Sequence, residues 1–262
     1  MRRAPTVAIL IELCLVLVLT PVDAQAAVDL CRGATIVGTE GSDVLIGTSH
    51  ADVIVGLGGD DRIEGMGGND RICGGDGADR LFGGTGNDFL APGAGDGRSD
   101  GGRGILDAVS FEGEQLGYAT VDLAKNTGGT ASGWQRLEGI EVVFGTKFQD
   151  EIYGSFRDEV FWGGGSGDAI WGRGGRDVIH GEAGKNDLYG GPGDDRLDST
   201  GRLQAWGGSG GDRLIGSALG DRLLGGGGDD TLTGNDGDDH LDGGAGADTC
   251  AGGAGADTIE SC

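Results

Sequence analysis

The chain has 262 residues, of which 61 are glycine, and it carries a formal net charge of −24 at pH 7. Such acidity excludes nucleic-acid binding, which needs a basic footprint. Low hydrophobicity with high net charge is also typical of disordered chains, so we expect order to depend on a bound ligand.

Residues 1–26 have the pattern of a secretory signal peptide. Two arginines at the start precede an apolar run over residues 7–19, and small residues at Ala24 and Ala26 suit cleavage. The run is short for a membrane span, Glu12 is irregular within it, and no later segment is apolar enough to cross a membrane. We therefore expect a secreted, extracellular chain with no transmembrane segment after cleavage.

A nonapeptide repeat begins at Gly38, after a lead-in over residues 27–37 that suits an N-terminal cap. Its clearest copy is Gly225–Thr233, which has the form glycine-glycine-any-glycine-any-aspartate-any-aliphatic-any. Six copies fill residues 38–91, and position eight is aliphatic in all six. The sixth positions are Asp43, Asp52, Asp61, Asp70, Asp79 and Asp88. The first two copies lack several of the glycines.

The period fails over residues 92–144. Strand-like runs at residues 108–111, 119–123 and 140–144 are separated by glycine and polar residues. So short a segment would make only a marginal core as a separate domain. We expect a divergent β spacer that continues the same parallel architecture irregularly.

The period returns over residues 145–198, and then over 207–260 after an eight-residue copy at 199–206 that has no acidic residue. Position six of the second array holds Asp150, Glu159, Asp168, Asp177, Asn186 and Asp195. Position six of the third holds Asp212, Asp221, Asp230, Asp239, Asp248 and Asp257. Glu159 is longer and Asn186 is neutral, which puts their sites in doubt. Residues 199–262 thus comprise a short linking repeat, the third array and a C-terminal cap.

These repeats resemble the RTX, or hemolysin-type, calcium-binding repeat family. The resemblance covers residues 38–91 and 145–260 directly and the spacer more loosely. It implies an all-β fold, a right-handed parallel β-roll, or β-solenoid, with calcium bound between stacked turns and two nonapeptides in each coil. The N-terminal signal and the cysteines depart from the family's toxins, so the chain looks more like its small stand-alone secreted members.

The residue types explain why calcium suits this spacing. Glycines serve where the turn needs a positive φ or a close backbone approach, and position six adds a carboxylate to the hard carbonyl oxygens that Ca²⁺ prefers. Aspartates stacked about 4.8 Å apart would repel by roughly 3 kcal/mol at an effective dielectric of 20, so calcium is a condition of folding. The expected ligands are Asp43, Asp52, Asp61, Asp70, Asp79, Asp88, Asp150, Asp168, Asp177, Asp195, Asp212, Asp221, Asp230, Asp239, Asp248 and Asp257.

Four cysteines remain after cleavage of the signal peptide, an even number that favours disulfides in an exported protein. Three pairings are open. Sequence position favours Cys31 with Cys73 and Cys250 with Cys262, because each link would tie down one end of the solenoid. Free thiols or metal ligands are the alternative.

No residue set indicates catalysis. Gly207–Gly211 formally matches the nucleophile elbow G-x-S-x-G, but it lies in a repeat turn and lacks the strand and helix of that motif. The three histidines are scattered. We therefore expect no enzymatic activity.

Position nine of the second array points outward, and alternate copies share a sheet. Tyr153, Trp171, Tyr189 and Trp206 should therefore form one column with rings near enough to stack. Self-stacking or cover by the spacer would explain the column, and so would a face that binds a sugar chain or a protein.

The leading hypothesis is a secreted, non-enzymatic, calcium-binding module with a structural or interaction role. The alternative is a calcium-dependent adhesin whose partner is a cell-surface glycan or protein. Ice binding would need a regular Thr or Asn ladder, and Thr85 and Asn87 provide this in only one repeat.

Overall fold

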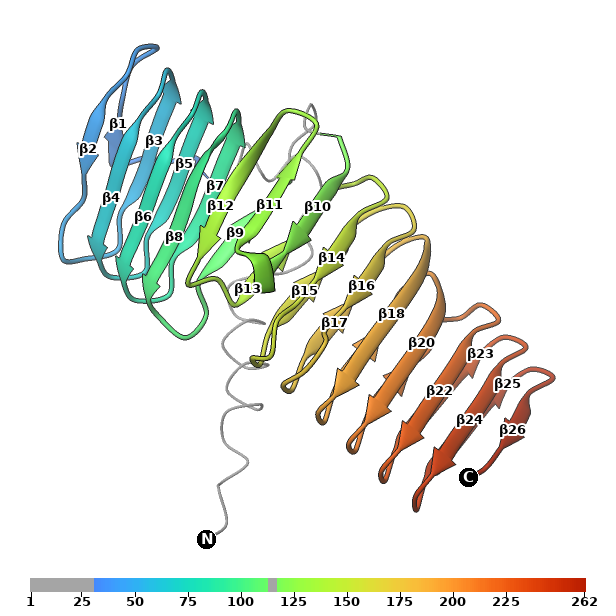
Figure 1. The fold of residues 1–262 in the computed structure, drawn as a ribbon. Helices are drawn as coiled ribbons and strands as arrows, with labels where there is room; N and C mark the ends of the chain where they lie inside the picture. The colour runs from blue at the N-terminus through green and yellow to red at the C-terminus, as the bar shows by residue number, and fades with distance from the viewer. Residues whose placement is uncertain (1–30, 113–116) are drawn as a thin grey trace, which may run out of the picture.

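The computed structural model describes residues 31–112 and 117–262, which form a β-solenoid made of two long sheets (Figure 1). Its coils follow one another along a single axis from β1 and β2 to β26. The expected signal peptide lies outside the described residues. Within the described part of the chain, no helix is long and apolar enough to cross a membrane.

Sheet A has twelve strands in spatial order. They are β1 (Ile36–Val37), β3 (Val53–Gly58), β5 (Arg71–Asp76), β7 (Phe89–Ala94), β9 (Ala108–Ser110), β13 (Val142–Phe144), β15 (Val160–Trp162), β17 (Val178–His180), β19 (Arg196–Asp198), β21 (Arg213–Ile215), β23 (Thr231–Asp236) and β25 (Thr249–Ala254).

Sheet B has fourteen strands. They are β2 (Val44–Ile46), β4 (Arg62–Gly67), β6 (Arg80–Thr85), β8 (Gly97–Arg103), β12 (Gly133–Glu138), β11 (Thr127–Thr130), β10 (Ala119–Asp122), β14 (Glu151–Tyr153), β16 (Ala169–Trp171), β18 (Lys185–Pro192), β20 (Arg202–Ser209), β22 (Arg222–Gly227), β24 (His240–Ala245) and β26 (Thr258–Glu260). A short 3-10 helix, η1 (Leu123–Lys125), follows β10.

The register confirms that two nonapeptides make one coil. In sheet A, Ile54 pairs with Ile72, and in sheet B Leu223 pairs with Leu241, each 18 residues further along the chain. Both pairings are parallel. The predicted all-β parallel solenoid is therefore correct.

The core is a ladder of position-eight side chains between the two sheets. Ile72, Leu188 and Leu232 have no exposed surface, whereas their strand neighbours at positions seven and nine are exposed or half-buried. The ladder weakens at both ends, where Leu45 is half-buried and Ile259 is 47% exposed.

The spacer departs from the expected parallel extension. Strands β8 and β12 pair in parallel, as do β10 and β14, but β12, β11 and β10 form an antiparallel meander between them. All three strands of the meander belong to sheet B, where they lie between β8 and β14 (Figure 1). Buried Phe111, Val121 and Leu137 give this segment an apolar core that is continuous with the ladder.

The disulfides join the cysteines in the pairing that sequence position favours. Cys31 is linked to Cys73, which lies on β5. Cys250, on β25, is linked to Cys262. Each bond thus holds a terminal segment against a strand near one end of the solenoid.

Candidate metal centres in the stacked turns

The turns stack in two columns, one leading into the strands of each sheet, and position six is the last residue of each turn. One carboxylate oxygen of this residue ties its turn to the preceding coil. The backbone N–H of Asp70 donates to Oδ1 of Asp88 at 2.8 Å, and that of Asp195 donates to Oδ1 of Asp212 at 2.8 Å. The position-six aspartates are therefore part of the ladder between coils.

The other oxygen, Oδ2, is left without a partner in eleven of these aspartates. In the described part of the chain these atoms are buried and accept no hydrogen bond. They belong to Asp61, Asp70, Asp79, Asp88, Asp107, Asp168, Asp177, Asp195, Asp212, Asp230 and Asp239. A buried carboxylate oxygen without a partner is costly, so each marks a place for a cation.

Glycine at position one makes room beside this oxygen. A Cβ on Gly190 would collide with Oδ2 of Asp195 and with the carbonyl oxygen of Gly207 in the next coil. The same two kinds of oxygen converge on Gly207, from Asp212 and Gly225. Only glycine leaves this space open, and hard oxygen donors line it.

These donors fit Ca²⁺, which takes carboxylate and carbonyl oxygens in flexible geometry. Among residues 31–112 and 117–262, no three His, Cys, Asp or Glu side chains gather around one point. One carboxylate per turn, with backbone carbonyls, is therefore the donor set. Bound calcium supplies the positive charge that stacked carboxylates lack.

Burial raises the pKa of most of these carboxyl groups when no cation is present. It raises the pKa of Asp168 and Asp177 to about 8, and that of Asp212 to about 7. Repulsion from the aspartates of neighbouring coils acts in the same direction. The folded turns therefore favour a proton or a cation on each site.

Asp43, Asp52, Asp150 and Asp221 differ, because a hydroxyl-bearing residue at position two closes the turn. The N–H of Thr146 donates to Oδ2 of Asp150 at 2.6 Å, and its hydroxyl lies 2.8 Å from Oδ1. Equivalent pairs are Thr39 with Asp43, Thr48 with Asp52, Ser155 with Glu159, and Ser217 with Asp221. Backbone donation from Thr48 lowers the pKa of Asp52, whereas burial outweighs the same bonds at Asp150, where it raises the pKa to about 6, and also raises the pKa of Glu159.

Other turns depart from the aspartate pattern in other ways. Asn186 donates from Nδ2 to Ser199 Oγ at 2.9 Å and to the Glu182 carbonyl at 3.3 Å. In the linking repeat Leu203 pairs in register with Asn186, so no carboxylate stands there. The terminal Asp248 and Asp257 are only half-buried.

Asp107 is a site residue that the sequence reasoning missed. Its Oδ1 accepts the N–H of Asp88 at 2.8 Å, its Oδ2 has no partner, and burial raises its pKa to about 7. It ends the turn of a ten-residue copy, residues 101–110, in which Leu106 is one residue too many. The signal was the Gly-Gly-x-Gly that opens this copy. Asp70, Asp88 and Asp107 thus form one run of stacked sites.

The four outer aromatic side chains form a continuous stack. Ring centroids are 4.4 Å apart between Tyr153 and Trp171, 5.3 Å between Trp171 and Tyr189, and 4.4 Å between Tyr189 and Trp206. All four are half-buried. Since each inner ring is covered on both faces by its neighbours, the column presents mainly ring edges to solvent.

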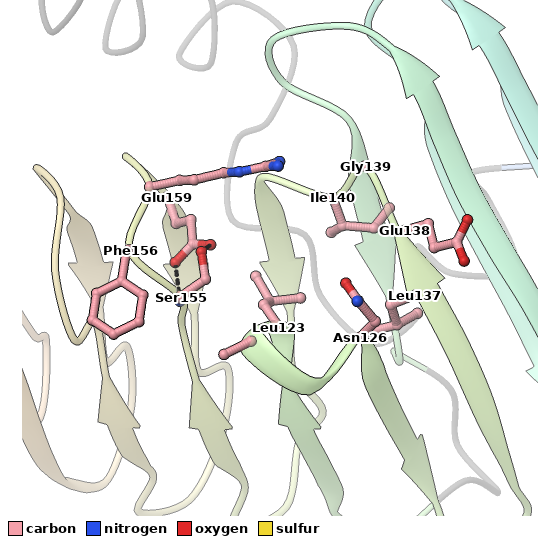
Figure 2. Close-up of a pocket in the computed structure, with 11 residues that line it drawn as sticks. Leu123, Asn126, Leu137, Glu138, Gly139, Ile140, Ser155, Phe156 and Glu159 are labelled. Carbon is pink, nitrogen blue, oxygen red and sulfur yellow. Dashed lines mark hydrogen bonds between the residues drawn. The ribbon is translucent and has the colours of Figure 1, made fainter.

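A cavity of about 390 Å³ lies where η1 meets the turn of residues 155–159 (Figure 2). Leu123 and Ile140 line it on the spacer side, and Phe156, which is 83% exposed, stands on the other. Figure 2 also shows Glu159 bonded to Ser155. The antiparallel meander opens this gap because it replaces a stacked turn.

A family model for the RTX calcium-binding nonapeptide repeat matches residues 34–63, 55–90, 64–99, 162–197, 206–235 and 224–259. These segments cover more than half of the chain and include most of the stacked sites. No curated protein matches the chain. The repeated motif, the two parallel sheets and the matched segments agree, and the chain belongs to the RTX calcium-binding nonapeptide repeat family.

Proposed function

We propose that this protein is a secreted, non-enzymatic module that calcium folds into a rigid rod with a structural or interaction role outside the cell. The proposal rests on the stacked position-six aspartates, whose Oδ2 atoms are buried and have no partner. The longest such run of successive coils contains Asp177, Asp195, Asp212 and Asp230. Without a cation, four stacked carboxylates would oppose the packing of the strands that follow them.

Two features support a location outside the cell. Disulfides persist in oxidising compartments, and the two bonds here link both terminal segments to the solenoid. Extracellular calcium is also abundant enough to fill sites of the modest affinity that extracellular modules have.

The contacts of the acidic side chains support a structural role. The position-six carboxylates accept backbone N–H groups of the preceding coil and so join one coil to the next. Ser209, the serine of the apparent nucleophile motif, lies on β20 beside Pro192 and Gly227, neither of which can act as a base. A catalytic serine needs a base within hydrogen-bond reach.

Circular dichroism of the mature chain tests the proposal. Most of the β signal should appear only on adding Ca²⁺ to the chelator-treated protein, with half-saturation on the order of 10⁻⁴ to 10⁻³ M. Mg²⁺ at the same concentrations is the control, since it demands tighter octahedral geometry. An unchanged spectrum with no heat of calcium binding would overturn the proposal.

A calcium-dependent adhesin is the second candidate, and the half-buried aromatic column supports it. Its ring edges run across four strands of sheet B, and Arg173 lies over the Tyr153 ring at 5.4 Å. Tryptophan fluorescence of the calcium-loaded protein, titrated with cell-wall polysaccharides, tests this role. A response to one polymer that Trp171→Ala abolishes would support it, and no response to any polymer would count against it.

A further inference from the structure

The residue at position two of each repeat separates the turns into two classes. Wherever a position-six Oδ2 is buried and unpartnered, the residue at position two has a positive φ. These residues are Leu57, Met66, Gly75, Gly84, Gly102, Gly164, Arg173, Gly191, Gly208, Gly226 and Asn235. In the five turns that contain Thr39, Thr48, Thr146, Ser155 and Ser217 at this position, φ is not positive.

The backbone difference has a direct effect on the carboxylate. In the second class the position-two N–H points at the carboxylate, as in Thr146 to Asp150 at 2.6 Å and Ser217 to Asp221 at 2.5 Å. In four of the five turns the hydroxyl also accepts the N–H of position four, as Thr146 does from Phe148 at 3.0 Å. Position four need not be glycine there. We call these hydroxyl-closed turns.

A hydroxyl-closed turn has no need of a cation to satisfy its carboxylate. The N–H and the hydroxyl of position two both donate to the carboxylate, so the oxygen that stays bare in the other class has a partner here. Hydrogen bonds to a carboxylate favour its charged form.

Two hydroxyl-closed turns adjoin the spacer. Thr146 and Ser155 close both turns of the coil of residues 145–162, directly after the antiparallel meander. This coil packs on the spacer through Ile152 and Phe161, which have no exposed surface. We define residues 119–162 as the central block.

We propose that the central block folds without calcium and serves as the template on which calcium assembles the repeats that follow it. This rests on the proposed function, since it assigns the calcium-dependent part of the fold to particular turns. Asp150 and Glu159 then act as structural acceptors within the block. The first coil, residues 38–55, is closed in the same way by Thr39 and Thr48.

Hydrogen exchange of the full mature chain, resolved by peptide, tests the proposal in chelator and in calcium. In chelator, amides of residues 119–162 should exchange at least tenfold more slowly than those of residues 163–198 and 207–260. In calcium all three segments should be protected. Equal, fast exchange of all segments in chelator would overturn the proposal.

A double variant, Thr146→Val with Ser155→Ala, removes both hydroxyls while keeping side-chain size. In chelator the protection of residues 145–162 should fall at least tenfold, and the number of calcium ions bound at saturation should not change. Thr85→Val is the matched control, because Thr85 occupies position three and closes no turn. Unaltered protection in the double variant, or a loss of bound calcium, would overturn the role of the hydroxyls.

The two proposals fail differently. If the chain binds no calcium, the proposed function is wrong. If it binds calcium but the amides of the central block are unprotected in chelator, only the proposal that the block is a template is wrong. Circular dichroism in calcium shows whether each variant folds.

Discussion

The central block and the third array, residues 207–260, share the same two sheets and the same core ladder, yet the turns of the array, apart from the hydroxyl-closed turn of Ser217, differ from those of the block in their chemistry. In the block, Thr146 and Ser155 satisfy the carboxylates with hydroxyl and backbone donors. In the array, Asp212 and Asp230 keep a buried oxygen that no protein group reaches. The same strand geometry therefore occurs with two kinds of turn. In one kind protein groups satisfy the carboxylate, and in the other we expect a cation to do so.

Core truncation should separate the two regions most strongly. Phe161→Ala removes a fully buried ring from the block and should cost about 3–5 kcal/mol, while Leu232→Ala in the array should cost about 2–5 kcal/mol. Thermal unfolding in calcium should detect both. In chelator only Phe161→Ala should have an effect, because the array is already unfolded. A matching loss for Leu232→Ala in chelator would contradict the comparison.

Removal of a single carboxylate charge should have the next largest effect. Asp212→Asn, in a turn whose Oδ2 has no protein partner, should raise the calcium concentration at half-saturation about tenfold, since the loss of a charged partner at a buried site costs about 1–3 kcal/mol. Asp221→Asn in the next repeat is the control, because Ser217 already bonds Asp221. Calcium titration followed by circular dichroism compares them. Equal shifts would remove the distinction between the two classes.

Acid should partly replace calcium in the turns whose position-six Oδ2 has no protein partner. Burial raises the pKa of Asp168 and Asp177 to about 8 in the folded chain, whereas an unfolded aspartate titrates near 4. Because the folded pKa is the higher one, this contribution to stability is complete below about pH 4 and is lost as the pH rises through about 8. The β signal of decalcified protein should therefore be larger at pH 5 than at pH 8.5. A signal that grows with pH would contradict this sign.

The smallest effect should come from the aromatic column. Tyr189→Ala removes a ring that stacks on both Trp171 and Trp206, whereas Trp206→Ala removes only one of the stacking contacts. Each such contact contributes about 0.5–1.5 kcal/mol beyond burial. If stacking governs the column, the calcium-loaded protein should lose more thermal stability with Tyr189→Ala than with Trp206→Ala after correction for buried area. The reverse order would point to a different role for the column.

The resemblance of the nonapeptides to the RTX family was sufficient to predict the solenoid and its stacked register, and the period of nine predicted the core ladder. It places one aliphatic residue inward in every copy, and Ile72 and Leu188 are buried accordingly. The antiparallel meander could not be predicted, because residues 119–138 follow no period and strand direction there depends on tertiary pairing. Asp107 was missed because Leu106 shifts it out of phase.

The two classes of turn differ in sequence at position two, but the effect of that residue becomes clear only from its backbone φ. Threonine at position two resembles an ordinary substitution for glycine until φ is known. The hydroxyl-closed turn at Thr146 also tolerates Phe148 at position four, a residue that would otherwise suggest a decayed repeat. At Thr146 and Phe148 the usual glycines of positions two and four are absent because hydrogen bonds of the threonine close the turn.

Coil length is less strict than the repeat suggests. Tyr189 pairs with Trp206 after 17 residues, and Asp88 bonds Asp107 after 19, yet the strands on either side keep their partners. The turns absorb an inserted or deleted residue, while side-chain packing restores alignment. Variants that gain or lose one residue in a turn should therefore still fold. Because the turns can differ in length by a residue while the strands stay in register, the solenoid can change length without losing its strand pairing.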